Sequence, residues 1–528
     1  MKLLLLNPAY PFEELPTPPF GLISLAAYLL ERGVQVRIED YIVTPYSRKR
    51  VEKILSEYAP DVVGATAVTM NVNTALTLLK EYKEENPDIF TIMGGPHVTF
   101  DAQSILDKND QVDCIVRGEG EITTVELLES INSLSSLSRV QGISYRTNGR
   151  IFHNQDRTLI DDINILPFPA RHLVPLNRYK ALTFPLNMTT ARGCPYNCIF
   201  CAGRKMMGRK VRYFDVKRVV DEFEMLSKMG FRQINVVDDL FTSNEKRCIA
   251  ICDEIIERGI SHPWNAFARV NTVSKRLLEK MKQAGCTTLC FGVESGNQEI
   301  LNTIKKKITT EQVTKAVRLC NEVGMDSIGS YILGLPGESP ETVKESFAFA
   351  SGLNHSYGFH ILSPFPGTEI RERHEEYGIK ILTDDWDKYD ANHAVSETSY
   401  LSHKEIDRIV NTFNADIEET ISLIEKDREE NKQLSKKYMD HFESRDNLLF
   451  SKELITSELV EEYPGLDGGA GVGETIDDFV TFIETHTNFT RDSIQRRLDR
   501  LFSLGCLKVE KSKNGMDVKW AEFNSPCA

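Results

Sequence analysis

Short apolar runs alternate with amphipathic segments in two long stretches of this 528-residue chain, residues 1–146 and 186–366. A short apolar run fits a buried strand, and apolar residues that recur with a helical period fit one face of a helix. Regular alternation of the two predicts parallel sheets that are covered by helices. Because ligands bind at the carboxyl ends of such strands, the loops after the strands are the candidate functional segments.

The first stretch, residues 1–150, is expected to form a doubly wound, Rossmann-like parallel sheet. The expected strands are 2–6, 34–38, 61–67, 90–93 and 112–116, and the expected helices are 21–32, 48–58, 73–84 and 122–131. The loops after these strands are rich in proline and glycine, notably 16–22, 94–97 and 117–121. Glycine in such loops lets the backbone approach a large ligand closely.

The second stretch, residues 186–370, is expected to form an open, partial (βα)6 version of the TIM-like barrel, with its functional residues at the strand ends. The expected strands are 187–191, 233–237, 264–268, 288–293, 327–333 and 358–362. Strand ends carry Asp238-Asp239, Arg269, Glu294, the segment 334–338 and the segment 363–368. A single carboxylate there could equally cap a helix or form a surface ion pair. Their joint placement favours one shared site.

Three cysteines, Cys194, Cys198 and Cys201, lie within eight residues directly after the first strand of the barrel. Thiolates bind zinc, Cu(I) or iron–sulfur centres. Structural zinc sites usually add a second, distant pair of ligands. We therefore predict an iron–sulfur cluster with one open iron, against the alternatives of a small zinc site or three buried thiols.

This C-x3-C-x2-C loop, with the aromatic Phe200 before its last cysteine, resembles the cluster motif of the radical S-adenosylmethionine (SAM) enzymes. In that family the cysteines hold a [4Fe-4S] cluster, the open iron chelates SAM, and the aromatic residue lies beside the adenine. The resemblance implies that Asp239 faces the SAM amino group and that Glu294 accepts hydrogen bonds from the ribose. It also implies that Arg269 and Gly334 line the SAM pocket.

The first stretch resembles the cobalamin-binding domain of the B12-dependent branch of that family. The resemblance implies that Gly94 and Gly95 lie near the nucleotide tail and that Thr66 to Thr69 lie near the corrin ring. The full set of cobalamin contacts expected in this way is Pro18, Thr66, Thr69, Gly94, Gly95, His97, Gly118 and Glu119.

One departure from that domain follows the second strand. Many cobalamin domains have Asp-x-His-x-x-Gly there, with the histidine bound to cobalt, but this chain has Asp40 followed two residues later by Ile42. Either the lower face of the cobalt has no protein nitrogen ligand, or the domain has lost cobalamin. His97 is a conceivable substitute ligand, and a hydrogen bond within its own loop is the alternative.

The remaining segments are expected to connect and extend these two domains. Residues 151–185 are a proline-rich linker, and 371–460 form a helical extension with helices at 402–425 and 429–442. The glycine-rich segment 465–473 lacks the Lys-Ser/Thr of a phosphate-binding loop, so it is expected to be a tether.

The tail, residues 470–528, has the pattern of a winged helix. A helix at 476–485 and a second helix ending at Leu504 precede runs 506–511 and 516–520, which flank Asn514-Gly515, a strong hairpin signal. The second helix carries Arg491, Arg496, Arg497 and Arg500. DNA reading, capture of a peptide and plain scaffolding are all compatible with such a unit.

Composition limits the possible partners. The net charge of −14 weighs against broad attraction to nucleic acid or anionic membrane. No apolar run approaches the ~20 residues that cross a bilayer, and the amino-terminal segment lacks a signal-peptide profile. Of eleven cysteines, eight lie outside the three-cysteine loop, including the pairs Cys248/Cys252 and Cys286/Cys290. We interpret them as buried thiols of a cytoplasmic protein.

Together these resemblances imply a cobalamin-dependent radical SAM methyltransferase. A 5′-deoxyadenosyl radical takes hydrogen from an unactivated carbon, methylcobalamin supplies the methyl group, and a flavodoxin- or ferredoxin-type donor supplies the electron. The winged-helix tail gives a peptide or protein acceptor a slight preference over a small molecule. The alternatives are a B12-dependent cyclase or ring-rearranging enzyme and, from another class, a cobalamin-sensing winged-helix regulator.

Overall fold

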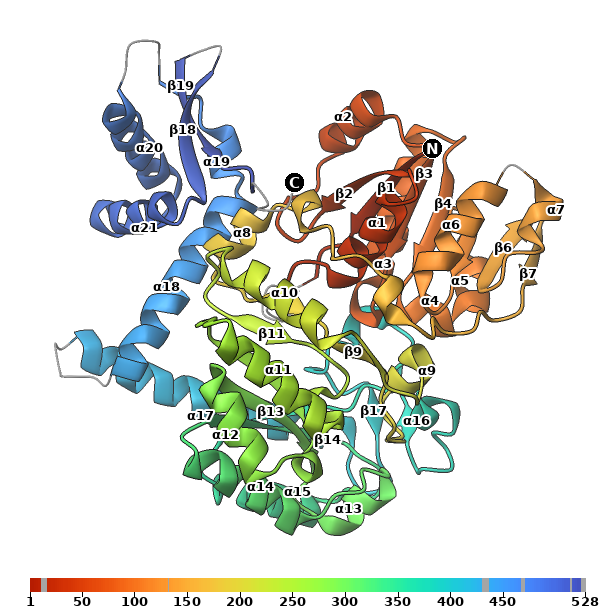
Figure 1. The fold of residues 1–528 in the computed structure, drawn as a ribbon, viewed down its shortest axis with the longest axis vertical. Helices are drawn as coiled ribbons and strands as arrows, with labels where there is room; N and C mark the ends of the chain where they lie inside the picture. Colours follow the sequence, from red (N-terminus) through yellow and green to blue (C-terminus); the bar gives the residue numbers. More distant parts are fainter. Residues whose placement is uncertain (11–16, 132, 430–435, 467–470, 513–514, 524–528) are drawn as a thin grey trace.

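The computed structural model describes all residues except 11–16, 132, 430–435, 467–470, 513–514 and 524–528 (Figure 1). The amino-terminal part is a seven-stranded sheet with the order β2-β1-β3-β4-β5-β6-β7, in which β1 to β5 are parallel. Its strands are β1 (Lys2–Asn7), β2 (Gln35–Asp40), β3 (Val62–Thr66), β4 (Phe90–Gly94), β5 (Cys114–Val116), β6 (Ile143–Thr147) and β7 (Arg150–His153). The five predicted strands are therefore confirmed.

Helices cover both faces of this sheet (Figure 1). They are α1 (Phe20–Leu30), α2 (Arg48–Tyr58), α3 (Val72–Glu85), α4 (Pro96–Phe100), α5 (Ala102–Lys108), α6 (Gly120–Ser130) and α7 (Leu134–Leu137). The run Leu3 to Leu6 explains this arrangement: Leu3 and Leu5 belong to one apolar core, whereas Leu4 and Leu6 belong to another on the opposite face. A strand that is buried on both faces reads as a continuous apolar run.

The second part is a six-stranded parallel sheet with the order β15-β14-β13-β12-β11-β8. Its strands are β8 (Leu186–Met188), β11 (Ile234–Val236), β12 (Trp264–Ala268), β13 (Cys286–Glu294), β14 (Asp326–Leu333) and β15 (Ser356–Ile361). Six parallel strands with helices on the outside form the partial barrel, so the predicted fold class is confirmed (Figure 1).

The barrel helices begin where the sequence supplies capping side chains. The Thr309 hydroxyl accepts a hydrogen bond from the Gln312 N–H at the start of α14, and Ser339 caps α15 in the same way, with Pro340 as its first residue. The outer helices are α10 (Val216–Ser227), α11 (Glu245–Glu257), α12 (Lys275–Gln283), α13 (Gln298–Thr303), α14 (Thr310–Glu322) and α15 (Pro340–Ser351). Each cap fixes the backbone at the start of its helix.

A short antiparallel ribbon interrupts the barrel pattern between β8 and α10. It consists of β9 (Ala191–Arg192) and β10 (Arg212–Tyr213), with Arg212 opposite Arg192. The three-cysteine loop and the short helix α9 (Gly203–Met207) lie between its two strands. The ribbon therefore holds both ends of the cysteine loop.

The carboxy-terminal part consists of helices and a winged-helix-like unit. Helix α17 (His403–Glu429) is longer than the expected 402–425, and α18 (Lys436–Thr456) extends well beyond the expected end at residue 442. Helices α19 (Leu459–Glu462), α20 (Val472–His486) and α21 (Arg491–Ser503) pack with the hairpin β18 (Leu507–Ser512) and β19 (Gly515–Trp520). Asn514 in the expected turn lies outside the described residues, as do residues 467–470 of the expected glycine tether, and Gly473 lies within α20.

None of the helices in the described part of the chain has both the length and the apolar character that a membrane span requires.

Candidate active site

The cysteine loop is anchored at its first residues. The Cys194 N–H donates to the carbonyl of Gly208 (3.1 Å), which ties the start of the loop to the end of α9. Gly193 has a φ of +105°, and a Cβ there would lie 2.6 Å from the Lys210 carbonyl oxygen. Only glycine fits this position without displacing backbone. The sequence Gly193-Cys194 thus fixes where the first thiol lies.

The three thiols share one electrostatic environment. Desolvation raises the pKa of Cys194, and the nearby charges of Asp239 and Cys198 raise it further, while the backbone N–H of Tyr196 and the charge of Arg269 oppose the rise. Thiolates are the ligands of iron–sulfur clusters, and the positive charge of the iron ions offsets the repulsion between neighbouring thiolates. The donor set therefore fits a cluster on this loop.

The three cysteines of the loop differ in exposure. Among the described residues, no three His, Cys, Asp or Glu side chains gather closely enough to hold a single metal ion. Cys198 is buried, Cys194 is half-buried and Cys201 is exposed. The Gly203 N–H donates to the Cys201 Sγ (3.3 Å). The loop thus runs from the protein interior to the surface.

Glu294 and Lys306 form a buried ion pair next to this loop. Glu294 Oε1 lies 2.5 Å from Lys306 Nζ, and each residue is 6% exposed. Register shifts between Gly292 and Glu294 in β13, and Glu294 has a φ of +72°, so the strand is bent at this carboxylate. The Lys306 ammonium also lies 5.8 Å from the centre of the Phe200 ring. These side chains supply a carboxylate, a cation and an aromatic face at one end of the barrel.

The two adjacent aspartates after β11 have different surroundings. Asp238 is buried and accepts hydrogen bonds from the Thr190 hydroxyl and from the Thr190 and Ala191 N–H groups. Desolvation raises its pKa to about 6. Asp239 is exposed and accepts a hydrogen bond from the Gly193 N–H (2.8 Å). Asp238 therefore organises the chain before the cysteines, and Asp239 is free to meet a ligand beside them.

Arg269 contacts the cysteine loop. Its Nη1 lies 3.7 Å from the Cys198 Sγ, its guanidinium lies 3.5 Å from the centre of the Tyr196 ring, and Nη2 donates to the Lys306 carbonyl. In this structure Arg269 therefore contacts Cys198 and Tyr196 of the cysteine loop with its guanidinium group. It also links the loop to the Glu294 and Lys306 pair.

Gly334 lies in a turn that Glu338 organises. The Gly334 and Leu335 N–H groups both donate to Glu338 Oε2, at 2.6 and 3.2 Å. Glu338 is fully buried, and desolvation raises its pKa to about 8. The turn at the end of β14 is thus held from within the barrel.

A large cavity lies between the amino-terminal sheet and the barrel. It contains about 1210 Å³ of empty space and opens to solvent. The sheet side contributes Thr66, Gly94, Gly95, Gly118 and Glu119, five residues of the predicted cobalamin set. The barrel side contributes Thr189, Arg192, Met206, Met207, Val237 and Asp239. One cavity therefore touches the cobalamin loops, the ribbon residue Arg192 before the cysteine loop and the helix α9 after it.

Glycines make up much of the sheet side of this cavity. Gly95 has a φ of +103°, and a Cβ there would lie 2.6 Å from the Ala67 carbonyl oxygen. Gly118 has a φ of +73°. A wall built from backbone lets a large, flat ligand approach closely. The residues present therefore fit a corrinoid.

Three residues of the predicted cobalamin set are not among the described residues that line the cavity: Pro18, Thr69 and His97. His97 is buried, its Nδ1 lies 3.2 Å from the Thr69 hydroxyl, and its ring meets Trp386 edge-on at 4.8 Å. Desolvation lowers its pKa to about 4. His97 therefore forms a hydrogen bond between neighbouring loops.

The position of the missing histidine motif is filled by a buried network. Asp40 accepts hydrogen bonds from Asn7 Nδ2 (2.7 Å) and from the hydroxyl of Tyr179 in the linker (2.8 Å). Desolvation raises the pKa of Asp40 to about 6. Ile42 is buried beside it. Asp40, the first residue of the altered motif, is thus bonded to the linker helix α8 (Leu176–Ala181).

Sequence reasoning missed the residues that join the two parts of the site. Arg192 and Arg212 bind Glu119 and Glu121 across the domain boundary. Lys306 was missed because it follows a helix rather than a strand end. Met206 and Met207 line the cavity from α9. The one available signal was the position of Arg192 directly before the cysteine loop.

The other cysteine pairs have no such setting. Cys248, Cys252 and Cys286 are buried, as predicted, and burial raises the pKa of each thiol. Cys290 is only half-buried on β13, which differs from the prediction.

Comparison with known proteins agrees with this geometry. Residues 188–350 match the model of the Radical SAM superfamily, and residues 14–128 match the model of the B12 binding domain. The chain is 36% identical to the uncharacterized methyltransferase PH0819 of Pyrococcus horikoshii over 399 residues, which cover 74% of this chain and 86% of that protein. It is 29% identical to an anaerobic magnesium-protoporphyrin IX monomethyl ester cyclase of Rubrivivax gelatinosus, over 75% of this chain and 73% of that protein.

Two solved structures share the fold. The radical SAM methyltransferase TsrM from Kitasatospora setae, solved with cobalamin and a [4Fe-4S] cluster bound, superposes with a TM-score of 0.64 at 20% identity, over 73% of this chain and 81% of that one. The cobalamin-dependent radical enzyme OxsB has a TM-score of 0.68 at 18% identity, over 95% of this chain and 83% of that one.

A barrel with a three-cysteine loop, facing a corrinoid cavity, defines a radical enzyme that uses a [4Fe-4S] cluster, SAM and cobalamin. The chain belongs to the family of cobalamin-dependent radical SAM methyltransferases.

Proposed function

We propose that this enzyme transfers a methyl group to an unactivated carbon of a small molecule, and that the shared cavity is where the reacting groups meet. The observation that supports this is the composition of the cavity wall. Gly94 and Gly95 line it from the sheet, and Asp239 lines it from the cysteine-loop side. A ligand in the cavity would thus lie against the cobalamin loops and against Asp239, which accepts a hydrogen bond from the Gly193 N–H at the start of the cysteine loop.

When bound, the cluster with SAM supplies a hydrogen-abstracting carbon radical, and cobalamin supplies the methyl group. The chain's own residues position these groups. Cys194, Cys198 and Cys201 would hold the cluster, and Asp239 would accept hydrogen bonds from the SAM amino group. Holding reacting groups in a fixed geometry is the main contribution a protein makes to such chemistry.

The pair Glu294 and Lys306 would complete the SAM site. Glu294 can accept hydrogen bonds from ribose hydroxyls, and the Lys306 ammonium can bind the SAM carboxylate while staying near Phe200. In the protein without SAM, the charges of Glu294 and Lys306 balance each other. Arg269 would act indirectly, because its donors already bind the cysteine loop and the Lys306 carbonyl.

We also propose that no protein nitrogen binds the lower face of the cobalt. Ile42 lacks a donor atom, and the Asp40 carboxylate is bonded to Tyr179 and Asn7. His97 is bonded to Thr69 and packed against Trp386. Electron paramagnetic resonance of the Co(II) form tests this, because a nitrogen ligand splits the cobalt lines and its absence leaves them unsplit.

The preference for a small molecule follows from the relatives and from the tail. Relatives that the chain resembles over most of its length are named for small acceptors, such as cytidylyl-2-hydroxyethylphosphonate and a hopanoid. The winged-helix-like unit is the feature that favours a peptide or protein acceptor. Its helix α21 packs against the body of the protein: Arg500 Nη1 donates to the Ala181 carbonyl, and Arg497 pairs with Asp446 of α18.

That inward-facing helix also weighs against the regulator hypothesis. Arg491 is paired with Glu484 on α20, so three of the four arginines of α21 already have partners within the protein. Reading DNA requires such side chains to reach phosphates or bases.

A flavodoxin- or ferredoxin-type donor would deliver its electron near Cys201, the exposed cysteine of the loop.

Cyclisation without methyl transfer is the second candidate, because a cyclase is among the relatives that match most of the chain. One experiment separates these functions. The protein is reconstituted anaerobically with iron, sulfide and cobalamin and given SAM with a labelled methyl group, together with lysate split into metabolite and protein pools. Label in a metabolite supports the proposal, label in protein overturns the small-molecule acceptor, and product formed without label indicates the cyclase.

A further inference from the structure

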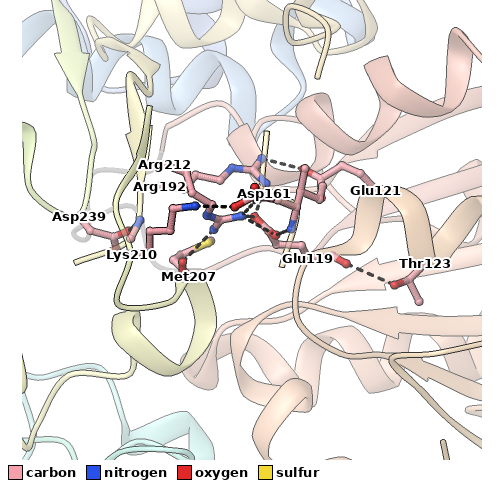
Figure 2. Close-up of polar contacts among 11 residues, drawn as sticks. Glu119, Glu121, Thr123, Asp161, Arg192, Met207, Lys210, Arg212 and Asp239 are labelled. Carbon is pink, nitrogen blue, oxygen red and sulfur yellow. Dashed lines mark hydrogen bonds and ion pairs between the residues drawn. The ribbon is translucent and has the colours of Figure 1, made fainter. Parts of the chain in front are cut away.

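Four buried charges join the two domains beside the cavity (Figure 2). Arg192 Nη1 lies 2.8 Å from Glu119 Oε1, and Arg192 Nη2 lies 2.7 Å from Glu121 Oε1. Arg212 Nη1 lies 2.9 Å from Glu119 Oε2. The four side chains are between 4% and 12% exposed. Two anions and two cations therefore balance one another out of water.

The two pairs come from separate domains. Glu119 and Glu121 lie at the start of α6 in the cobalamin domain, and Arg192 and Arg212 face each other on the ribbon β9–β10 of the barrel. The residues are 71 to 93 positions apart in the chain. This cluster of charges, hereafter the Glu–Arg clamp, is thus a contact between tertiary units and not a local motif.

Both carboxylate oxygens of Glu119 accept hydrogen bonds. Besides the two arginines, Glu119 Oε2 accepts a hydrogen bond from the Ile160 N–H (2.8 Å). Desolvation acts to raise the pKa of Glu119, but the hydrogen bonds and charges of Arg212 and Arg192 hold it below its usual range. Glu119 was predicted as a cobalamin contact; although it lies at the cavity wall, its carboxylate is directed to the arginines.

From the clamp, the chain leads directly to the cluster loop. Arg192 is followed by Gly193, whose N–H donates to Asp239, and then by Cys194. Arg212 Nη2 donates to the Met207 carbonyl (2.8 Å) at the end of α9. Desolvation raises the pKa of Asp239, and the Gly193 N–H and the charges of Arg212 and Arg192 oppose the rise. A shift of α6 would therefore move both ends of the cysteine loop and change the field at Asp239.

We propose that Arg192 and Arg212 are positioning residues that couple the cobalamin cavity to the SAM site. A corrinoid in the cavity fixes the loop before α6, the clamp transmits that placement to the ribbon, and the ribbon orients Cys194 and Asp239. This inference rests on the proposed function for the location of both cofactors. It states that cobalamin and SAM assist each other's binding, in addition to reacting together.

The experiment measures this assistance as binding, with no turnover required. Protein with an oxidised cluster is dialysed against radiolabelled SAM, with and without hydroxocobalamin. We expect cobalamin to tighten SAM binding by about 5-fold or more, the lower end of common coupling strengths, and SAM to tighten cobalamin binding by the same factor. A wild-type factor near one overturns the proposal.

Glu121→Gln tests the clamp, because it keeps the shape of the side chain and removes the charge that faces Arg192. Each cofactor should still bind alone, but the coupling factor should fall to near one. Arg192→Lys keeps the cation but loses the forked geometry, so it should retain part of the coupling factor. It provides a second test of the clamp if Glu121→Gln does not fold. If Glu121→Gln binds both cofactors with the wild-type coupling, the proposal is wrong.

Lys210→Gln is the matched control. Lys210 lies on the same segment and pairs with Asp161 at 2.7 Å, but the two side chains are 75% and 85% exposed (Figure 2). An exposed pair contributes little and is screened by salt. The control should keep the wild-type coupling factor, and an equal loss there would overturn the assignment to the clamp. Failure of methyl transfer with coupling intact would instead count against the proposed function.

Discussion

The ammonium group of Lys306 lies 2.5 Å from the carboxylate of Glu294, and three left-handed backbone positions surround this contact. Lys305 and Lys307, on either side of Lys306, have φ values of +56° and +55°, and Glu294 has +72°. Such conformations are costly for residues with a Cβ and gather at functional sites. The chain thus accepts local strain in order to direct one cation and one carboxylate to the same point.

Replacing Glu294 by Gln should destabilise the free protein and weaken SAM binding. The substitution leaves Lys306 buried without a counter-charge, and breaking one partner of a buried pair costs about 3–5 kcal/mol. Urea unfolding of the apoprotein measures the first effect, and dialysis with labelled SAM measures the second. Lys305→Gln is the control, since Lys305 is 38% exposed and its pair with Glu369 should contribute at most about 1 kcal/mol. Equal stability of the two variants would contradict the role given to the pair.

Cys198→Ala should abolish the cluster without unfolding the protein. Cys198 is the buried member of the loop and the one that Arg269 approaches. After anaerobic reconstitution we expect the variant to lack the brown colour and the reduced-cluster resonance signal. Cys252→Ala removes a buried thiol from α11 instead and should keep both. A variant at Cys198 that still binds iron and sulfide in full would refute the assignment.

Gly95→Ala should prevent cobalamin binding. Its Cβ would lie 2.6 Å from the Ala67 carbonyl oxygen, and the backbone at φ +103° is a region that only glycine occupies comfortably. The β4 loop must therefore move at the cavity wall. Gly33→Ala is the control that distinguishes backbone strain from a local effect on the cobalamin site. Gly33 also has a positive φ, +78°, but no atom lies within 4 Å of the position of an added Cβ. The control should lose about 1 kcal/mol of stability and bind hydroxocobalamin normally; equal binding by both variants would count against this wall as the corrinoid site.

The parts of the site that are local in sequence could be predicted, and the parts that depend on tertiary packing could not. A parallel sheet brings its strand ends together by topology, so Asp239, Arg269 and Glu294 could be placed without coordinates. The hairpin β6–β7 was missed because β7 is short and mostly exposed, without an apolar pattern. Lys306 gave no signal because nothing in its neighbourhood indicates that its ammonium is buried.

The cobalamin loops show the same limit. Small residues such as Gly94 and Gly95 were identified because large ligands require close approach of backbone. The contacts that a polar side chain in those loops makes depend on which residues from elsewhere in the chain pack against it. His97 is covered by Trp386, which lies almost three hundred residues later in the chain, and Glu119 is met by two arginines from the barrel. Sequence spacing carries no information about such partners.

Glu338 should make the protein less stable as the pH rises through neutrality. Its pKa is about 8 in the folded protein because its carboxyl is buried, against an ordinary value of 4.5. Between these two values the folded state binds more protons than the unfolded state, so stability falls with increasing pH. Each pKa unit corresponds to about 1.4 kcal/mol, which makes the total loss about 5 kcal/mol.

Glu338→Gln isolates this contribution. Glutamine can still accept the hydrogen bonds from the Gly334 and Leu335 N–H groups, but it cannot ionise. Urea unfolding at pH 5 and pH 9 should show that the variant gains on the wild type by several kcal/mol at the higher pH, while the two are similar at the lower pH. Glu341→Gln, three residues later at the exposed start of α15, should keep the wild-type pH dependence, because its carboxylate is hydrogen-bonded by Ser339 at the surface. A wild-type protein whose difference from Glu338→Gln is constant across this range would show that the buried carboxyl does not titrate there.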